Sequence, residues 1–194
     1  WPDPPMYYDI FNTFSYVAAR TDEIRFNTAV TVLPLRDPVW VAKQATTLDH
    51  FSDGRLILGT GVGAYREEFE AVHPDIDLPR GLIMDESVEA LAALLGDEGP
   101  TSYDGEQVGF EDVDLHPKPV QDPFPLYVGG NHDNAIERAV RWGNGWLPAG
   151  LTPAEIEARN EDIADLAAEY DRDPSDIDVA PQLIASIDRD PEQA

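Results

Sequence analysis

The most constraining feature of the sequence is a glycine-rich stretch that follows a short apolar run. Residues 56–58 have the composition of a buried strand, and glycine then occupies every second position at Gly59, Gly61 and Gly63. Glycine at the carboxyl end of a parallel strand lets backbone N–H groups approach a ligand, because no Cβ stands in the way. A tight strand-to-helix turn without a ligand explains the same pattern. The spacing differs from the dinucleotide-binding fingerprint, which needs a third glycine three residues after the second.

A second pair of glycines occupies an equivalent position later in the chain. Residues 126–128 have a strand-like composition and are followed by Gly129, Gly130 and Asn131, before a helix predicted from about Asp133. The first turn of a helix has free N–H groups and a positive dipole end, which suit a phosphate or a carboxylate. A helix start without a ligand is the alternative. Because the carboxyl ends of parallel strands share one edge of a sheet, the two glycine segments together favour a ligand site more than either alone.

Strand and helix patterns alternate along the chain. Helices are predicted over residues 9–20, 38–50, 66–72, 82–95, 133–142 and 153–170, strands over 24–33, 55–59, 126–128, 146–147 and 177–187, a short hairpin within 102–110, and a further helix start at Asp190. This alternation predicts a parallel α/β sheet. Roughly five strands are present, whereas a closed barrel of this class has eight. The sheet is therefore either open or an incomplete barrel.

Charge and composition exclude several classes of function. The chain has 38 acidic and 13 basic residues, a net charge of −25, and a surface of this kind repels nucleic acid and anionic membranes. No apolar run of about 18 residues and no signal peptide is visible, so we expect a cytoplasmic protein without a membrane partner. Only Lys43 and Lys118 are lysines, and scarce lysine with abundant aspartate resembles proteins of salt-loving archaea. The absence of cysteine and of metal-site histidine spacing predicts no metal.

Several conspicuous side chains are expected to be structural. Arg80 is expected to lie near Asp85 and Glu86 in a partly buried ion pair. Trp40 and Trp146 are expected in the hydrophobic core, which is the commoner place for tryptophan.

Taken together, the segments resemble the luciferase-like monooxygenase superfamily, the flavin- or coenzyme F420-dependent oxidoreductases. The segments that carry the resemblance lie in family order within about residues 10–150: 24–38 (IRFNTAVTVLPLRDP), 42–44 with 47–49, 54–69, Arg80-Gly81, 117–121, 127–131 and 143–148. The resemblance implies a (β/α)8 TIM barrel of which roughly strands 3 to 7 are present. Residues 1–194 would then form a single luciferase-like barrel domain that is truncated at both ends. It also implies coenzyme F420 or FMN at the C-terminal mouth of the barrel, a small-molecule substrate and a homodimer.

The resemblance assigns nine residues to the cofactor. The peptide between Ala29 and Val30 falls where the family often has a non-proline cis bond behind the ring; Gly61, Val62, Gly63 and Ala64 match the loop that passes the ring and phosphate; and Gly129, Gly130 and Asn131 match the phosphate-binding turn. Val62 stands where F420-dependent sugar-phosphate dehydrogenases have an acidic glutamate. Valine cannot exchange a proton, so the substrate stays open. The catalytic loop of the family would precede Trp1, and no catalytic residue is assigned.

Three functional hypotheses follow. The leading one is an oxidoreductase that uses F420 or FMN for hydride transfer or monooxygenation on an unidentified small organic substrate. The alternative is a non-catalytic or inactive barrel fragment that binds a phosphorylated ligand. A lyase or isomerase for phosphorylated sugars would need a lysine or an acid at a strand end, and none is identified. Because an incomplete barrel exposes unpaired strand edges, we expect the chain alone to be unstable or partner-dependent.

Overall fold

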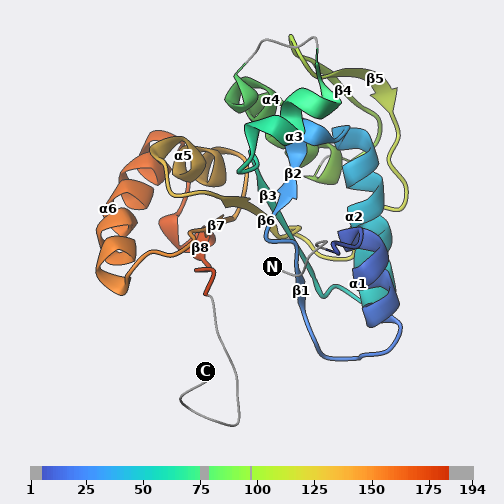
Figure 1. Ribbon diagram of the computed structural model, residues 1–194, viewed down its shortest axis with the longest axis horizontal. Helices are drawn as coiled ribbons and strands as arrows, with labels where there is room; N and C mark the ends of the chain where they lie inside the picture. Colours follow the sequence, from blue (N-terminus) through green and yellow to red (C-terminus); the bar gives the residue numbers. More distant parts are fainter. Residues whose placement is uncertain (1–5, 75–78, 97, 184–194) are drawn as a thin grey trace.

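A parallel sheet backed by helices forms the framework of the protein, in a computed structural model that describes residues 6–74, 79–96 and 98–183 (Figure 1). The strands are ordered β1, β3, β6, β7 and β8, and β2 also pairs with β3. Every pairing in this sheet is parallel. The predicted parallel α/β fold is confirmed, and the sheet is open, with β1 and β8 at its two ends.

The elements in chain order are α1 (Ile10–Ala18), β1 (Phe26–Asn27), β2 (Thr31–Val32), η1 (Leu33–Leu35), α2 (Pro38–Ser52), β3 (Leu56–Gly61), α3 (Arg66–Val72), α4 (Arg80–Gly96), β4 (Thr101–Asp104), β5 (Gly109–Val113), β6 (Leu126–Gly129), α5 (Asp133–Arg141), β7 (Gly145–Leu147), α6 (Pro153–Glu169), η2 (Pro174–Asp176) and β8 (Asp178–Val179). Local signals set several helix starts. The Asp37 side chain accepts from the first-turn amides of α2, and Thr152 with Glu155 forms a capping box at the start of α6. The predicted hairpin is the antiparallel pair β4–β5.

The single strand predicted from Ile24 to Leu33 is interrupted in the structure, where β1 and β2 are separated by three residues. Asn27 pairs with Ile57 of β3, whereas Thr31 pairs with Thr60. The segment 27–31 therefore contains one residue more than the segment 57–60 that it pairs with. One extra residue of this kind is a bulge, which bends the strand and redirects its side chains.

The bulge contains the non-proline cis peptide between Ala29 and Val30. Its predicted position is therefore confirmed. The continuous strand was predicted because periodicity reports the burial of side chains and not the pairing of the backbone.

Two other boundaries differ from the sequence prediction. β3 continues to Gly61, so Gly59 and Gly61 belong to the strand and only Gly63 lies in the loop. The last strand was predicted over residues 177–187, but β8 covers only Asp178–Val179. Residues beyond 183, including the predicted helix start at Asp190, lie outside the described residues.

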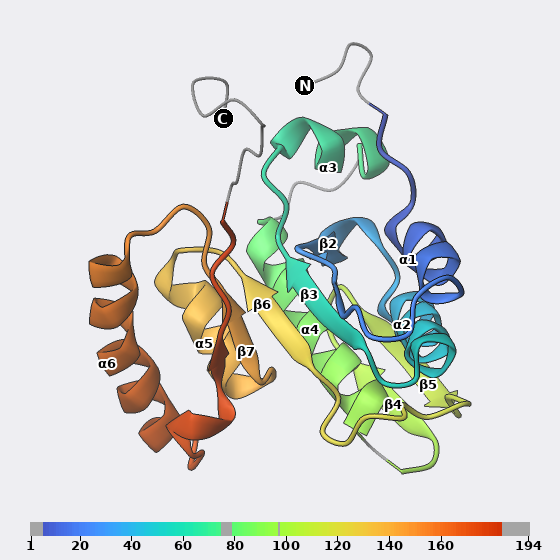
Figure 2. The same cartoon turned by 90° about the horizontal axis from the view of Figure 1, so that it is seen from below.

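The hydrophobic core lies between the sheet and its helices. Leu56, Leu58 and Val128 belong to the core cluster, as does Trp146, which is fully buried as predicted. Since alternate residues of a strand face opposite sides, the residues between them face the other, inner side of the sheet. Figure 2 looks onto this inner side, with α4 behind the strands. The prediction for Trp40 is wrong: it lies on the outer face of α2 and is 69% exposed.

A buried carboxylate on α2 fixes the segment that leads into β6. Asp49 is fully buried and accepts hydrogen bonds from the backbone N–H of Val120 (2.7 Å) and from the Gln121 side chain (2.8 Å). The Gln121 amide also donates to the Leu56 carbonyl oxygen at 2.7 Å. The resemblance at residues 47–49 and 117–121 therefore coincides with a structural clamp at the amino end of β3.

Candidate functional site

Three of the nine predicted site residues, Val30, Gly61 and Gly129, meet at the carboxyl edge of the sheet. A Cβ added to Gly61 would lie 2.7 Å from Val30 Cγ2, and one added to Gly129 would lie 2.6 Å from Val30 Cγ1. The bulge after β1, the end of β3 and the end of β6 are thus in direct contact. Gly61 and Gly129 have a packing reason to be glycine that is independent of any ligand.

The loop after β3 is held by its backbone. Gly63 has a positive φ of 82°, which glycine adopts without strain, and its carbonyl oxygen accepts from Arg80 Nη1 at 3.1 Å. Val62 is half-buried and packs against the core, whereas Ala64 is exposed. The loop therefore offers backbone groups to its surroundings.

The ion pair predicted for Arg80 is not the one that forms. Asp85 pairs with Arg138 of α5 at 2.5 Å, and Glu86 accepts from backbone amides of the β4–β5 hairpin. Spacing along one helix suggested the Arg80 pairing. The packing of α4 against α5 and against the β4–β5 hairpin gives Asp85 and Glu86 other partners.

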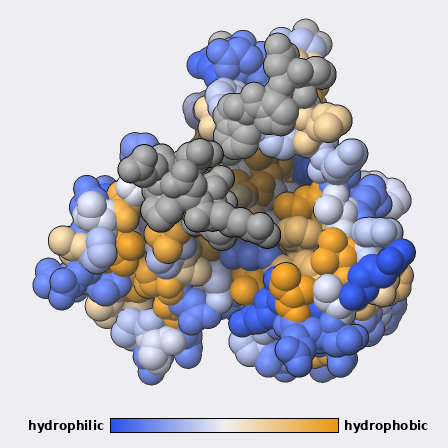
Figure 3. Space-filling view, turned by 60° about the horizontal axis from the view of Figure 1, so that its bottom comes forward, coloured by the Kyte–Doolittle hydropathy of each residue, from blue (hydrophilic) through white to orange (hydrophobic). Residues whose placement is uncertain are grey.

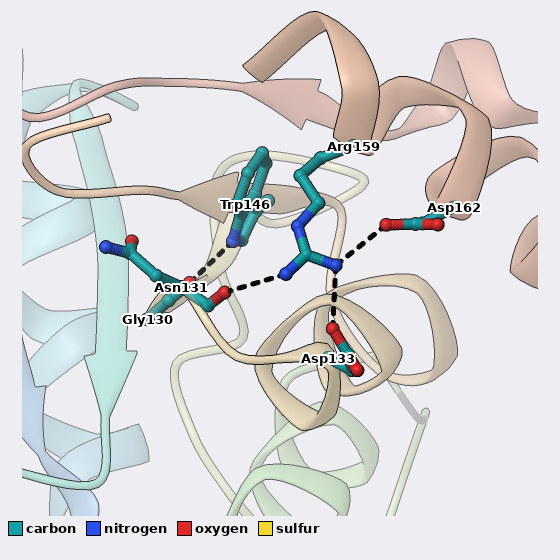
Figure 4. A network of polar contacts seen from close by, with 6 residues as sticks. All are labelled: Gly130, Asn131, Asp133, Trp146, Arg159 and Asp162. Carbon is teal, nitrogen blue, oxygen red and sulfur yellow. Dashed lines mark hydrogen bonds and ion pairs between the residues drawn. The ribbon is translucent and has the colours of Figure 1, made fainter. Parts of the chain in front are cut away.

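The turn after β6 is fixed by β7. The backbone N–H of Gly130 donates to the Leu147 carbonyl oxygen at 3.3 Å, and the indole N–H of Trp146 donates to the Gly130 carbonyl oxygen at 2.7 Å (Figure 4). Trp146 thus combines its core position with support of the turn. Gly130 has a positive φ of 134°, so a side chain there would be strained.

Asn131 is engaged by the loop after β7. Its side-chain amide donates to the Ala149 carbonyl oxygen at 2.8 Å, and its side-chain oxygen accepts from the Ala149 N–H at 3.0 Å. Asn131 therefore ties two strand ends together with both of its side-chain polar atoms. We expect it to position the turn more than to contact a ligand.

Arg159 of α6 adds a positive charge beside this turn. Figure 4 shows its guanidinium between the Asn131 carbonyl oxygen, Asp133 and Asp162. The distances are 3.5 Å to the carbonyl oxygen, 2.7 Å to Asp133 and 2.8 Å to Asp162. The pKa of Arg159 is raised by its hydrogen bonds to Asp162 and Asp133, so the guanidinium stays charged.

The start of α5 fits an anionic group. His132 is its N-cap residue but makes no side-chain cap. In the described part of the chain the N–H groups of Asp133 and Asn134 have no acceptor. Free amides and the helix dipole favour an anion, and the Asp133 carboxylate is drawn into a pair with Arg159, which also pairs with Asp162. A phosphate therefore fits this end of the site.

The inner face of the sheet is apolar where a planar ring would lie. Val30 is half-buried there, and the neighbouring positions Gly61 and Gly129 have no side chains. On the face shown in Figure 3, hydrophobic residues gather around a central hollow and hydrophilic ones lie toward the outside. An apolar wall beside an anion-binding turn fits a flavin or deazaflavin with a phosphate-bearing tail.

Tyr127 does not supply a base on this face. Its phenol donates to Asp178, and a Cβ at Gly145 would lie 2.3 Å from its ring. Burial, followed by the hydrogen bond to Asp178, raises the pKa of Tyr127 well above its ordinary value. The phenol therefore stays protonated and acts as a structural donor.

A cavity of about 1050 Å³ lies at the opposite, amino edge of the sheet. Four basic residues line it, and three of them are engaged: Arg172 with backbone carbonyls, Lys118 with the Leu94 carbonyl oxygen, and Arg141 over the Trp142 ring. The amino edge of barrel sheets usually serves stability, and ligands bind at the carboxyl edge. We therefore place the candidate site at the carboxyl edge.

Two residues that shape the site were not recognised from the sequence. Arg159 lies on an amphipathic helix, where an arginine has no distinctive pattern. Arg80 belongs to a segment that carries the family resemblance, but its contact with the Gly63 carbonyl depends on how α4 packs.

A family model described as luciferase-like monooxygenase matches residues 1–194. An uncharacterized protein of Mycobacterium tuberculosis is 33% identical over 156 residues, which cover 80% of this chain and 52% of that protein. The 5,10-methylenetetrahydromethanopterin reductase of Methanolobus tindarius is 30% identical over 186 residues, which cover 96% of this chain and 56% of the reductase. The chain spans about half the length of the curated relatives it matches.

The fold has a close counterpart among solved structures. The coenzyme F420-dependent tetrahydromethanopterin reductase of Methanopyrus kandleri superposes with a TM-score of 0.78 at 26% identity. The match covers 95% of this chain and 57% of that one. The predicted barrel type is confirmed, and the described sheet corresponds to part of a barrel.

Proposed function

Because this chain belongs to the luciferase-like monooxygenase family, we propose that it provides the cofactor-binding part of an F420- or FMN-dependent oxidoreductase. The observation that carries the proposal is the meeting of Val30, Gly61 and Gly129 beside the free amides of α5. An apolar wall and an anion-binding turn on one sheet edge suit the two chemically distinct parts of such a cofactor. Coenzyme F420 is favoured because the Methanopyrus kandleri reductase, which is 26% identical to this chain, depends on it.

The cofactor would supply hydride transfer or oxygen chemistry, and the chain would orient it. Ala29 and Val30 would form the wall behind the ring, and the loop 61–64 would pass its edge. The turn 129–131 and the first amides of α5 would hold the phosphate. None of the nine residues assigned from the resemblance carries a titratable side chain, so we propose that a catalytic base comes from another part of the enzyme. The substrate is proposed only as a small organic molecule.

Titration with each cofactor tests the proposal. The 194-residue protein in about 2 M KCl is titrated with F420 and separately with FMN, and cofactor fluorescence is followed. A saturable change with F420 is expected. A Gly129→Val variant should lose it, because the added side chain has no space beside Val30. A Gly96→Ala variant is the matched control, since a Cβ there meets nothing within 4 Å. No saturable change with either cofactor contradicts the proposal.

The alternative is a barrel fragment that binds a phosphorylated ligand without redox chemistry. The absence of an acid or base among the nine candidate residues favours it. Protection of the Asp133 and Asn134 amide signals by inorganic phosphate, without binding of either cofactor, would support this alternative.

Oligomeric state and location belong to the same proposal. We propose that the enzyme is a homodimer in the cytoplasm of a salt-adapted organism, as the resemblance and the charge of −25 suggest. No helix among the described residues is long and apolar enough to cross a membrane. Light scattering in high salt would measure the oligomeric state.

A further inference from the structure

The N-terminal part of α4 contacts the loop after β3 directly and contacts α5 through Arg138. At its first residue, the half-buried Arg80 donates from Nη1 to the Gly63 carbonyl oxygen at 3.1 Å. This is a contact with the loop after β3, seventeen residues earlier in the chain. The loop is thereby attached to a long helix and not only to its own strand.

The same part of α4 is joined to α5. Arg138 donates from Nε to Asp85 Oδ1 at 2.5 Å and from Nη2 to the Gly81 carbonyl oxygen at 3.3 Å. The Arg138 side chain is only 10% exposed, whereas the Asp85 side chain is 38% exposed, so only the arginine end of this ion pair is buried. Because α5 begins directly after the turn 129–131, the turn and the loop are connected through α4.

The contact of Arg80 fixes the direction of a peptide group. Gly63 has a positive φ and little intrinsic preference for one orientation of the following peptide. That peptide is not among the cis bonds, so its C=O and N–H point in opposite directions. With the oxygen held by Arg80, the Ala64 N–H points away from α4. In the described part of the chain this N–H has no acceptor.

We infer that Arg80 is a positioning residue for the cofactor: it orients the Gly63–Ala64 peptide so that the Ala64 N–H is presented to a hydrogen-bond acceptor of the cofactor. The Asp85–Arg138 pair joins α4 to α5, so it holds Arg80 at a fixed position relative to the start of α5. The inference depends on the proposed function for the identity of the ligand. The orientation of the peptide does not depend on it.

Two measurements on three variants test the inference. Arg80→Ala removes the contact, and Arg80→Lys keeps a charge and a donor. Arg20→Ala is the matched control, because Arg20 is exposed and stacks on Tyr16 at 5.0 Å. NMR order parameters of the Gly63 and Ala64 amides are measured without ligand. The dissociation constant of F420 is measured by fluorescence.

In the unsubstituted protein and in Arg20→Ala we expect order parameters of about 0.85, and in Arg80→Ala values below about 0.6. F420 binding should weaken about tenfold in Arg80→Ala, as for the loss of one hydrogen bond from the Ala64 N–H to the cofactor, and recover in part in Arg80→Lys. If Arg80→Ala proves to be unfolded, Arg80→Met takes its place, because methionine keeps an unbranched apolar stem without a donor, and unchanged order parameters and affinity in a folded Arg80→Met overturn the inference.

The outcomes separate the inference from the proposed function. If the unsubstituted protein does not bind F420, the proposed function fails, and so does the cofactor part of the inference. Unchanged order parameters in a folded Arg80→Ala overturn the positioning role itself. Lower order parameters with an unchanged F420 dissociation constant overturn its link to the cofactor.

Discussion

At the level of single residues, Val30 accounts for two of the glycines in the candidate site. Its two methyl groups occupy the space that a side chain at Gly61 or Gly129 would fill. The sequence alone left a ligand cradle and a tight turn as equal explanations. The structure adds a third reason, which is the close approach of a bulged strand. This reason is compatible with a cofactor on the inner face, because Val30 then forms the wall of the site.

The contact between Gly61 and Val30 predicts a specific energetic coupling. We expect Gly61→Ala to lower the free energy of unfolding by about 1–3 kcal/mol, because Val30 must shift to accept the methyl group. In a Val30→Ala background the same substitution should cost less, with a coupling of at least about 0.5 kcal/mol. Urea unfolding followed by tryptophan fluorescence measures both values.

Gly96→Ala provides the control for this cycle, since a Cβ there has open space around it. It should be neutral or stabilising by up to about 1 kcal/mol, through the unfolded state. A Gly61→Ala protein as stable as the Gly96→Ala protein would show that Val30 does not require glycine at position 61.

At the level of helices and strands, the carboxylate of Glu86 attaches the β4–β5 hairpin to α4, together with Glu89, which accepts from the Tyr103 hydroxyl at 2.8 Å. Glu86 accepts from the backbone N–H groups of Glu106 (3.0 Å), Gln107 (2.7 Å) and Val108 (2.8 Å). Burial raises the pKa of Glu86, but the hydrogen bonds from the three amides together lower it by more. The pKa in the folded protein is therefore below the ordinary value of 4.5. The folded hairpin therefore favours the charged form of Glu86.

The direction of that shift predicts a pH-dependent contribution to stability. A group whose pKa is lowered on folding stabilises the protein fully above its unfolded pKa, and this stability is lost as pH falls through the folded pKa. Glu86→Gln should therefore lower the free energy of unfolding by about 1–2 kcal/mol at pH 7. The difference should shrink as pH falls below the ordinary pKa of 4.5 and through the lowered pKa of the folded state, because the native carboxyl then becomes protonated as well.

Urea unfolding at pH 7 and pH 3.5 measures this difference. Glu161→Gln, at an exposed position of α6, corrects for the general effect of removing one negative charge. A stability difference that stays constant between the two pH values would rule out the carboxylate as its cause.

In the molecule as a whole, the large negative net charge opposes folding. The net charge of −25 on 194 residues produces self-repulsion that only screening can relieve. Ion pairs between described residues are few and mostly at the surface. Added salt therefore weakens few favourable interactions while it screens the repulsion. Among the described residues β1 and β8 have no further strand partner, and edges of this kind favour pairing with another chain.

Salt should therefore stabilise this protein. The Debye length falls from about 10 Å at 0.1 M to about 3 Å at 1 M, so most of the repulsion is screened in that range. We expect the Tm to rise between 0.1 and 1 M KCl and then to level off, as measured by circular dichroism. A second titration with sodium sulfate at matched ionic strength separates two effects of salt. Screening depends on the ionic strength alone, whereas sulfate also stabilises a protein because it is excluded from the protein surface. A Tm that stays constant or falls would contradict the role of self-repulsion.

Local sequence signals were sufficient to predict which elements form and in which order, because caps, turns and hydrophobic periodicity act over a few residues. Asp37, Thr152 and the glycines after β3 and β6 set element ends that the structure reproduces to within a few residues. The resemblance located the cis peptide at Ala29–Val30. The way in which Val30, Arg80 and Asn131 connect the strand ends became visible only in the folded chain. These contacts join residues far apart in the sequence, and their geometry depends on a bulge and on helix packing that periodicity does not encode.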